Sequence, residues 1–281
     1  MKNKMMNALS ELGFTGEETI AVKNGVKRPA IRVIIPNMNV SPIIYCDEPL
    51  ETFDKEEFKK NILDAVKNVQ KQAEVYDVGE KLQDKDFFKE NLFVRVMNKD
   101  KKENLTEELV FDIPNTDWIG VCSVHCSVSS DNGTATPKKE FLSNILCMED
   151  EAIVRLAIDN SRSEICVRPM SEVIAELIGD DFSAPTPDKP MYVATNKSKV
   201  YGIGGILKTD FLKEVSKRFF DGKDFILFPS SVHECIFVPA EGMTKEYATE
   251  TVLFGNATCE PDIILDDKAY IVKNGEIFRF E

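Results

Sequence analysis

Hydrophobic residues recur at helical spacing over residues 54–75 of the chain. Phe58, Ile62 and Val66 lie on one face of the helix that this spacing predicts, and lysine and glutamate side chains fill the positions between them. The pattern therefore predicts an amphipathic helix whose apolar face covers a sheet. The charged residues on its other face are explained by contact with water and need no binding partner.

Shorter apolar runs bounded by turn residues predict strands and further helices. Residues 19–22 and 30–35 flank Asn24-Gly25, a pair that favours the positive φ angles of a tight hairpin. Further strands are expected at residues 42–46, 92–97, 118–128, 191–195, 225–228 and 233–238 and in a final hairpin at 270–280. Further helices are expected at residues 84–90, 137–147, 149–160, 170–178, 210–220 and 244–254. The glycine-rich residues 201–207 are expected to be extended.

The order of these elements mixes hairpins with helices. It favours an α+β fold with mixed, largely antiparallel sheets flanked by amphipathic helices. Ile113-Pro114-Asn115 interrupts the pattern, and we place there a boundary between two α+β subdomains, residues 1–113 and 114–281. A segment rich in aspartate and proline, residues 179–190, is expected to be a loop or a linker.

The chain is acidic, with a formal net charge of −13 from 48 acidic and 35 basic residues. Nucleic acids and anionic membranes are bound through dense lysine and arginine surfaces, so this charge argues against both as partners. It suits a protein partner with a basic surface, or it serves solubility alone. The chain has no run of about 18 apolar residues, so we expect no membrane span, and we also expect no signal peptide. Its seven scattered cysteines are interpreted as buried free thiols, and we expect a cytoplasmic protein.

The chain has two histidines, which limits the candidates for metal binding and nucleophilic catalysis. His125 stands beside Cys122 and Cys126, a grouping that resembles a metal site. In a strand the two cysteines would lie roughly 13 Å apart on one face, and the histidine would point to the other face. A zinc ion needs all its ligands within about 2.3 Å of one point. We therefore expect no metal and no cofactor.

Four neighbouring residues supply the side-chain types of acyl-transfer catalysis: Ser230, Ser231, His233 and Glu234. Such catalysis needs a nucleophile beside a histidine that a carboxylate orients. Ser231 could reach His233 across the expected turn, and Glu234 or a distant acid would orient the imidazole. The alternative interpretation is a polar turn whose histidine hydrogen-bonds the backbone.

One glycine cluster occurs, at Gly202, Gly204 and Gly205. It matches neither Gly-x-x-x-x-Gly-Lys-Ser/Thr nor Gly-x-Gly-x-x-Gly, the patterns that cradle phosphates. Glycines that let two backbones approach closely are the simpler interpretation. The polar and aromatic residues beside the cluster are kept as candidates for a binding site: Asn196, Lys197 and Tyr201.

Four segments together carry a resemblance to a known family. They are VSPIIY at residues 40–45, MYVATNK at 191–197, GGIL at 204–207 and PSSVHE at 229–234. In this order and spacing they resemble the uncharacterised family called domain of unknown function fifty-six eighty-eight, over most of the chain from about residue 30. Residues 98–117 depart most from it. The family has no established activity, and the resemblance implies a protein of Firmicutes carried by mobile genetic elements.

Two hypotheses about function follow. The first is a non-enzymatic, acidic, protein-binding accessory factor of a mobile genetic element, which could inhibit a host defence protein. The second is a hydrolase or transferase of unknown substrate that uses Ser230, Ser231, His233 and Glu234. The scarcity of catalytic side chains favours the first hypothesis. The protein partner and the oligomeric state do not follow from the sequence.

Overall fold

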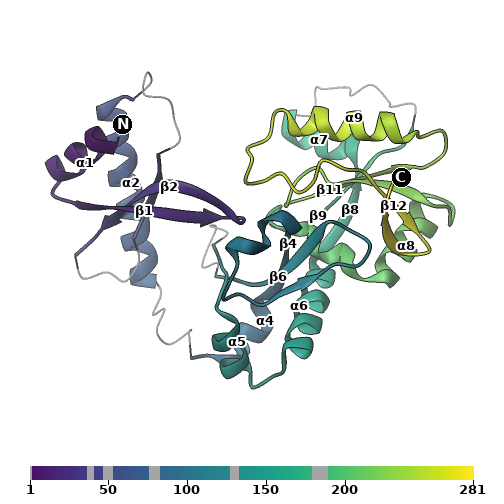
Figure 1. The fold of residues 1–281 in the computed structure, drawn as a ribbon, viewed down its shortest axis with the longest axis horizontal. Helices are drawn as coiled ribbons and strands as arrows, with labels where there is room; N and C mark the ends of the chain where they lie inside the picture. Colours follow the sequence, from purple (N-terminus) through teal and green to yellow (C-terminus); the bar gives the residue numbers. More distant parts are fainter. Residues whose placement is uncertain (1, 37–40, 47–52, 76–82, 127–132, 179–188) are drawn as a thin grey trace. The chain divides into compact units, whose positions relative to one another are not determined.

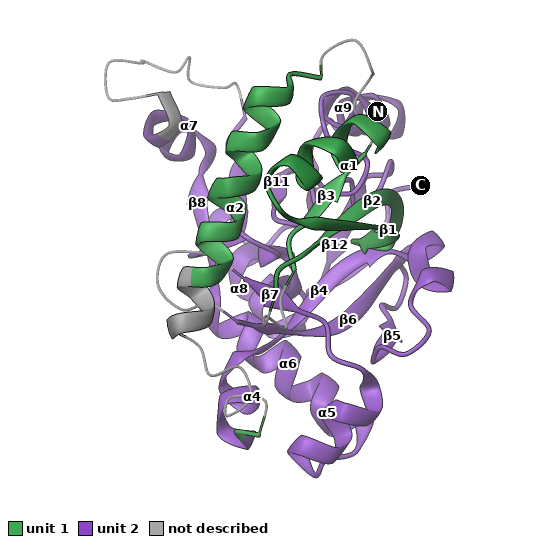
Figure 2. Cartoon of the chain, turned by 90° about the vertical axis from the view of Figure 1, so that its left-hand side faces the viewer, with its two compact units in different colours: residues 1–84, 128–130 green, residues 85–127, 131–281 purple. Residues whose placement is uncertain are grey.

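The computed structural model describes residues 2–36, 41–46, 53–75, 83–126, 133–178 and 189–281 (Figure 1). The chain divides into two compact units, residues 1–84 with 128–130 and residues 85–127 with 131–281 (Figure 2). The expected boundary between residues 113 and 114 falls inside the second unit. The subdomains 1–113 and 114–281 therefore stay a prediction.

The first unit joins a three-stranded antiparallel sheet to two helices. Its elements are α1 (Lys2–Glu11), β1 (Thr15–Lys23), β2 (Val26–Ile34), β3 (Ile43–Tyr45) and α2 (Lys55–Val75). The predicted hairpin joins β1 to β2 through Asn24 and Gly25, whose φ angles are 49° and 73°. The amphipathic helix is also present, and Ile62 and Val66 of α2 pack with Leu9 of α1 in one core. Helix α1 was not expected from the sequence.

The second unit contains two sheets. One has the order β13-β12-β10-β11-β9-β8, formed by β8 (Ile165–Pro169), β9 (Tyr192–Asn196), β10 (Phe225–Phe228), β11 (Cys235–Pro239), β12 (Tyr270–Lys273) and β13 (Glu276–Arg279). The other has the order β4-β6-β5, formed by β4 (Leu92–Asn98), β5 (Val110–Asp112) and β6 (Trp118–His125), and β7 (Thr134–Ala135) pairs with β6. All strand pairs that the structure describes are antiparallel, which confirms the α+β class with largely antiparallel sheets.

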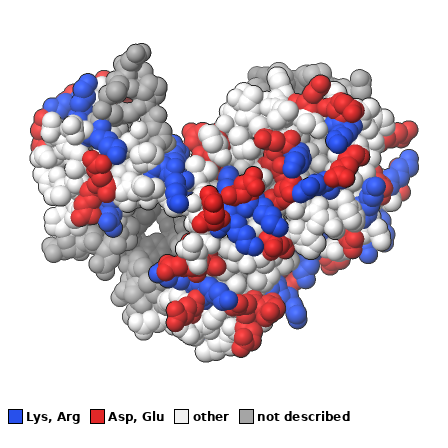
Figure 3. Space-filling model, viewed as in Figure 1, with Lys and Arg blue, Asp and Glu red and all other residues white. Residues whose placement is uncertain are grey.

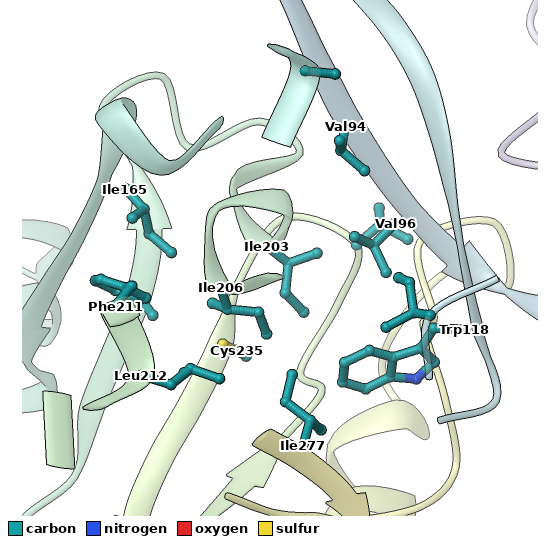
Figure 4. Close-up of a cluster of buried hydrophobic side chains, with 14 of the residues drawn as sticks. Val94, Val96, Trp118, Ile165, Ile203, Ile206, Phe211, Leu212, Cys235 and Ile277 are labelled. Carbon is teal, nitrogen blue, oxygen red and sulfur yellow. The ribbon is translucent and has the colours of Figure 1, made fainter. Parts of the chain in front are cut away.

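Helices cover these sheets. They are α4 (Lys85–Asn91), α5 (Lys139–Leu146), α6 (Asp150–Glu164), α7 (Met170–Ile178), α8 (Thr209–Phe219) and α9 (Lys245–Asn256), with the 3-10 helices η2 (Lys99–Asn104) and η3 (Gly202–Leu207). Side chains from both sheets, η3 and α8 meet in the main core, as Figure 4 shows for Val96, Ile203 and Leu212. A smaller core joins α9 to β10, β11 and β12. In the part of the chain that the structure describes, each helix is too short or too polar to cross a membrane.

The glycine-rich segment differs from its expected extended form, because residues 202–207 form η3. A side chain on Gly204 would place its Cβ 2.2 Å from the carbonyl oxygen of Val94, and one on Gly205 would lie 2.6 Å from that of Ser161. The glycines therefore let η3 lie directly against β4 and α6, as the simpler interpretation predicts. Most of the loop expected at residues 179–190 lies outside the described residues.

Candidate functional site

His233 is fixed by hydrogen bonds to the backbone around η3. Its imidazole Nδ1 accepts a hydrogen bond from the backbone N–H of Tyr201 at 3.1 Å. Its carbonyl oxygen accepts from the backbone N–H of Gly202 at 3.0 Å and from the hydroxyl of Thr195 at 2.9 Å. Because Nδ1 is an acceptor, the neutral ring carries its proton on Nε2. A histidine that takes a serine proton through Nε2 needs the opposite tautomer.

The residues around His233 form a hydrogen-bonded turn. The hydroxyl of Ser231 accepts from the backbone N–H of His233 at 3.0 Å, and the backbone N–H of Ser231 donates to the carbonyl of Glu234 at 3.1 Å. The backbone N–H of Ser230 donates to the carbonyl of Phe228 at 2.9 Å. Partial burial raises the pKa of the Glu234 carboxyl above its usual range. These bonds fit the polar turn with a backbone-bonded histidine.

A second turn ends at Tyr201 and is closed by Asn196. The buried side chain of Asn196 donates to the carbonyl of Val200 at 2.8 Å and accepts from its N–H at 3.1 Å. Lys199 and Tyr201 both have positive φ angles, 56° and 53°, which are uncommon for residues with large side chains. The bonds of Asn196 and His233 stabilise this backbone. Asn196 is therefore a structural residue, whereas Lys197 is exposed to solvent.

Tyr201 belongs to a row of rings that contains both histidines of the chain. The rings of His125 and Phe93 are stacked, with centroids 3.9 Å apart. The ring of Tyr201 lies 6.1 Å from that of Phe93 and 5.1 Å from that of His233. The guanidinium of Arg95 lies 5.5 Å from the centroid of the Tyr201 ring. The row crosses β6, β4 and η3, so the sequence gives no local signal for it.

Two polar atoms beside the rings are buried. The Nε atom of Arg95 and the Nε2 atom of His125 are buried, and neither has a hydrogen-bond partner within the described ranges. The nearest acid, Glu164, lies 3.7 Å from the His125 ring nitrogen. Burial lowers the pKa of His125, which favours the neutral ring. The row is thus a packed aromatic cluster in which His125 and Arg95 each have a buried polar atom.

The cysteines take different positions. Cys122 and Cys235 are buried, and burial raises the pKa of the Cys122 thiol to about 12. Cys147 is exposed, so the expectation of a buried thiol is wrong at that position. In residues 2–281, leaving aside the undescribed gaps, no three His, Cys, Asp or Glu side chains are placed to hold one metal ion.

A pocket of about 420 Å³ lies in the second unit, between η2 and the segment that follows α9. Its charged lining residues are Asp100, Lys101, Asp117, Asp266, Asp267 and Lys268. They come from three segments that are distant in the sequence. The sequence carries no signal for this pocket, because neighbouring aspartates such as Asp266 and Asp267 usually lie in solvated turns.

Asp266 accepts four hydrogen bonds beside the pocket. Its Oδ2 accepts from the indole N–H of Trp118 at 2.9 Å and from the hydroxyl of Tyr270. Its Oδ1 accepts from the backbone N–H groups of Asp267 and Lys268 at 2.8 and 3.2 Å. Burial raises the pKa of Asp266, and the donors oppose this effect. Because Trp118 lies in β6 and Tyr270 in β12, the carboxylate ties the two sheets together.

The two lysines of the pocket are already engaged. Lys101 Nζ donates to the carbonyls of Ile264 at 3.1 Å and Pro261 at 3.5 Å, and partial burial lowers its pKa. Lys268 Nζ lies 2.5 Å from a carboxylate oxygen of Asp117, which also pairs with Arg279. The positive charges at the pocket thus have partners within the protein.

Comparison with known proteins identifies a family. A family model described as Family of unknown function (DUF5688) matches residues 1–273. The match confirms the resemblance that the four sequence segments carry, and it extends to the first residue. Neither a curated protein nor a solved structure matches the chain.

Proposed function

Since the chain belongs to DUF5688, a family without an assigned activity, we propose a function from its surface. The protein is a non-enzymatic, acidic, protein-binding factor, and the outer face of α9 is its contact surface. The observation that carries this proposal is the exposure of three large apolar side chains on one helix. Tyr247 is 61% exposed, Leu253 49% and Phe254 83%.

Helix α9 has one side committed to the protein and another that is unpartnered among the described residues. Ala248 and Val252 are buried against the six-stranded sheet, which α9 covers in Figure 1. Tyr247 and Phe254 are seven residues apart and therefore lie on one face, two turns from each other. Aromatic side chains are enriched at protein interfaces, because they bury a large apolar area with few rotatable bonds. The exposed face of α9 therefore suits a protein partner.

The charged residues around α9 favour a partner whose contact surface is basic. Residues 241–260 carry four glutamates and one lysine around the apolar side chains of α9. Figure 3 shows acidic and basic side chains interspersed over the second unit, so no single large acidic field dominates that view. We therefore assign recognition to the apolar side chains, with a surrounding acidic rim that favours a basic partner. Such a rim makes binding weaker at high salt.

The wider role follows from the resemblance alone. We propose that the protein acts in the cytoplasm as an accessory factor of a mobile genetic element, with a host defence protein as one candidate target. The hydrolase or transferase alternative is supported by the residue types of the Ser230–Glu234 turn. It is disfavoured by the backbone bond at His233 Nδ1, which selects the tautomer opposite to that of a triad histidine.

The test is a comparison of captured partners. The tagged chain, a Tyr247→Ser/Phe254→Ser variant and an Ile20→Ser control would each be incubated with lysate of the native host. Ile20 is a suitable control because it is 68% exposed but lies in β1 of the first unit. We expect one partner to be retained by the wild type and the control, lost from the α9 variant, and recovered less at high salt.

Binding would then be measured between purified proteins. A partner that binds the α9 variant as tightly as the wild type would refute the α9 surface. If no protein binds in stoichiometric amount under any salt condition, the protein-binding function itself is refuted.

A further inference from the structure

We propose that the pocket between η2 and the segment after α9 binds the cationic head of an arginine or lysine side chain. The assignment of that side chain to the partner of α9 rests on the proposed function, whereas the cation site itself does not. The pocket has the volume of a small-molecule site, about 420 Å³. Its wall also belongs to the same stretch of chain as the α9 surface.

The pocket wall is fixed to the end of α9. Asn256 is the last residue of α9 and is buried. Its side-chain amide donates to the carbonyl of Asp266 at 2.9 Å and to the carboxylate of Asp267 at 2.7 Å. A partner that contacts the exposed face of α9 therefore has the pocket beside the helix terminus. In the proposed complex, one cationic side chain of that partner enters the pocket.

The charge balance of the pocket favours a cation. Four carboxylates and two ammonium groups line it, and the Arg279 guanidinium also pairs with Asp117, so the carboxylates outnumber these cations by one. Lys268 is paired with Asp117, and Lys101 is directed at two backbone carbonyls. Asp100 is exposed, and its carboxylate forms no ion pair or hydrogen bond with the residues that the structure describes. An incoming cation therefore finds an uncompensated carboxylate at Asp100 and an exposed one at Asp267, while an oxyanion would be repelled.

The apolar part of the lining selects among cations. Pro261, Ile264 and Leu265 stand beside the carboxylates. Arginine and lysine combine a hydrocarbon stem with a charged head, so the stem can cover apolar surface while the head meets the carboxylates. A bare metal ion would gain nothing from these three side chains. Lys101 already occupies part of the pocket wall, where its ammonium donates to the carbonyls of Pro261 and Ile264.

Trp118 provides a reporter for occupancy of the pocket. It is the single tryptophan of the chain, and its indole N–H donates to Asp266, a lining residue. The probe is arginine with an acetylated amino group and an amidated carboxyl group, so that its only charge is the guanidinium. The matched control probe is the citrulline analogue, in which a neutral urea replaces the guanidinium. Binding would be followed by the indole N–H signal in NMR spectra and by tryptophan fluorescence.

We expect the arginine probe to shift the Trp118 signal in a saturable manner and the citrulline probe to leave it nearly unchanged. Asp100→Asn and Asp267→Asn should each weaken arginine binding about fivefold, the effect of losing one nearby charge. Glu140→Gln is the control variant, because Glu140 is exposed on α5 and is absent from the pocket lining. It should bind the probe as the wild type does.

Equal responses to both probes would overturn the inference, as would equal binding by the wild type and the two aspartate variants. The titration with the arginine probe contains no partner protein, so a negative result would not refute the α9 contact surface. A negative result in the partner capture would likewise not refute the cation site. The link between them is tested separately. Asp100→Asn/Asp267→Asn should weaken binding of the identified partner, while Tyr247→Ser/Phe254→Ser should still bind the arginine probe.

Discussion

The second unit contains two polar clusters that differ in how they are built. The His233 turn is contiguous in the sequence, and its polar groups bond to neighbouring backbone atoms. The Asp266 cluster is assembled from η2, β6 and the segment after α9, and its side chains leave a pocket with accessible carboxylates. A contiguous run of catalytic residue types can thus be a turn, whereas residues scattered along the chain can form the more open site.

The largest expected effect concerns Asp266. Asp266→Ala would leave the buried indole N–H of Trp118 and the hydroxyl of Tyr270 without their shared acceptor. We expect the free energy of unfolding to fall by about 3 kcal/mol, since each abandoned buried donor costs about 1–3 kcal/mol. Urea denaturation followed by Trp118 fluorescence measures the loss. Asp100→Ala, at an exposed carboxylate with no hydrogen-bond partner among the described residues, is the control and should cost well under half as much.

The free energy of unfolding could instead fall no further in Asp266→Ala than in its control. That result would contradict the contrast between the His233 turn and the Asp266 cluster. It would mean that the carboxylate does not stabilise the joining of the two sheets. The pocket would then be a solvated surface feature, as the sequence suggests for paired aspartates.

The next effect concerns the packing that holds Tyr201 and η3 in place. Gly204→Ala would bring a Cβ to 2.2 Å from the carbonyl oxygen of Val94, so η3 or β4 must shift. We expect a loss of about 2 kcal/mol in the free energy of unfolding, the usual cost of overpacking. Gly255→Ala is the matched control, because it lies in α9 with no heavy atom within 4 Å of the added Cβ.

Alanine favours the helix over glycine, so Gly255→Ala should stabilise the protein by up to about 1 kcal/mol. Equal effects of the two substitutions would contradict the tight approach of η3 to β4. Thermal unfolding of both variants under one set of conditions decides between these outcomes.

These contacts also explain how far the sequence could predict the structure. The Asn24-Gly25 turn and the apolar face of α2 are local signals, and both elements form as expected. η3 was expected to be extended, because its conformation depends on distant contacts with Val94 and Ser161. β8 was missed because it begins at Ile165 directly after α6, with no turn residue between them.

The sequence predicts neither helix α1 nor the pocket, and the two reasons are related. α1 buries only Met5, Ala8 and Leu9, which give about one turn of helical periodicity, too little to stand out in a polar segment. The pocket residues carry ordinary charged side chains whose convergence depends on the pairing of distant segments. The His233 turn stood out for the opposite reason, since its residue types are adjacent in the sequence.

A smaller effect is expected at His233. His233→Ala would remove the acceptor of the Tyr201 backbone N–H and should destabilise the protein by about 1 kcal/mol. If the turn is structural, the purified variant should bind the partner of α9 with unchanged affinity. Calorimetric titration of wild type and variant measures that affinity. If the variant remains folded but no longer binds the partner, His233 has a role in binding and not only in the structure of the turn.

The smallest expected effect is a pH dependence at the other end of the aromatic row. Burial lowers the folded-state pKa of His125 below its usual 6.5, with Glu164 opposing this shift. The neutral ring is therefore favoured by folding, so its contribution to stability is present above pH 6.5 and is lost as the pH falls through the lowered pKa. His125→Phe keeps a ring against Phe93 but cannot take up a proton.

The wild type should thus lose stability relative to His125→Phe as the pH falls below 6.5. The measurement is the difference between the two free energies of unfolding across this range. His233 is present in both proteins, so its own titration cancels to the extent that the two rings are independent. A difference that stays constant with pH would show that His125 has the same proton affinity in the folded and unfolded chain. The cost of burying the charged ring would then be balanced by the attraction of the Glu164 carboxylate.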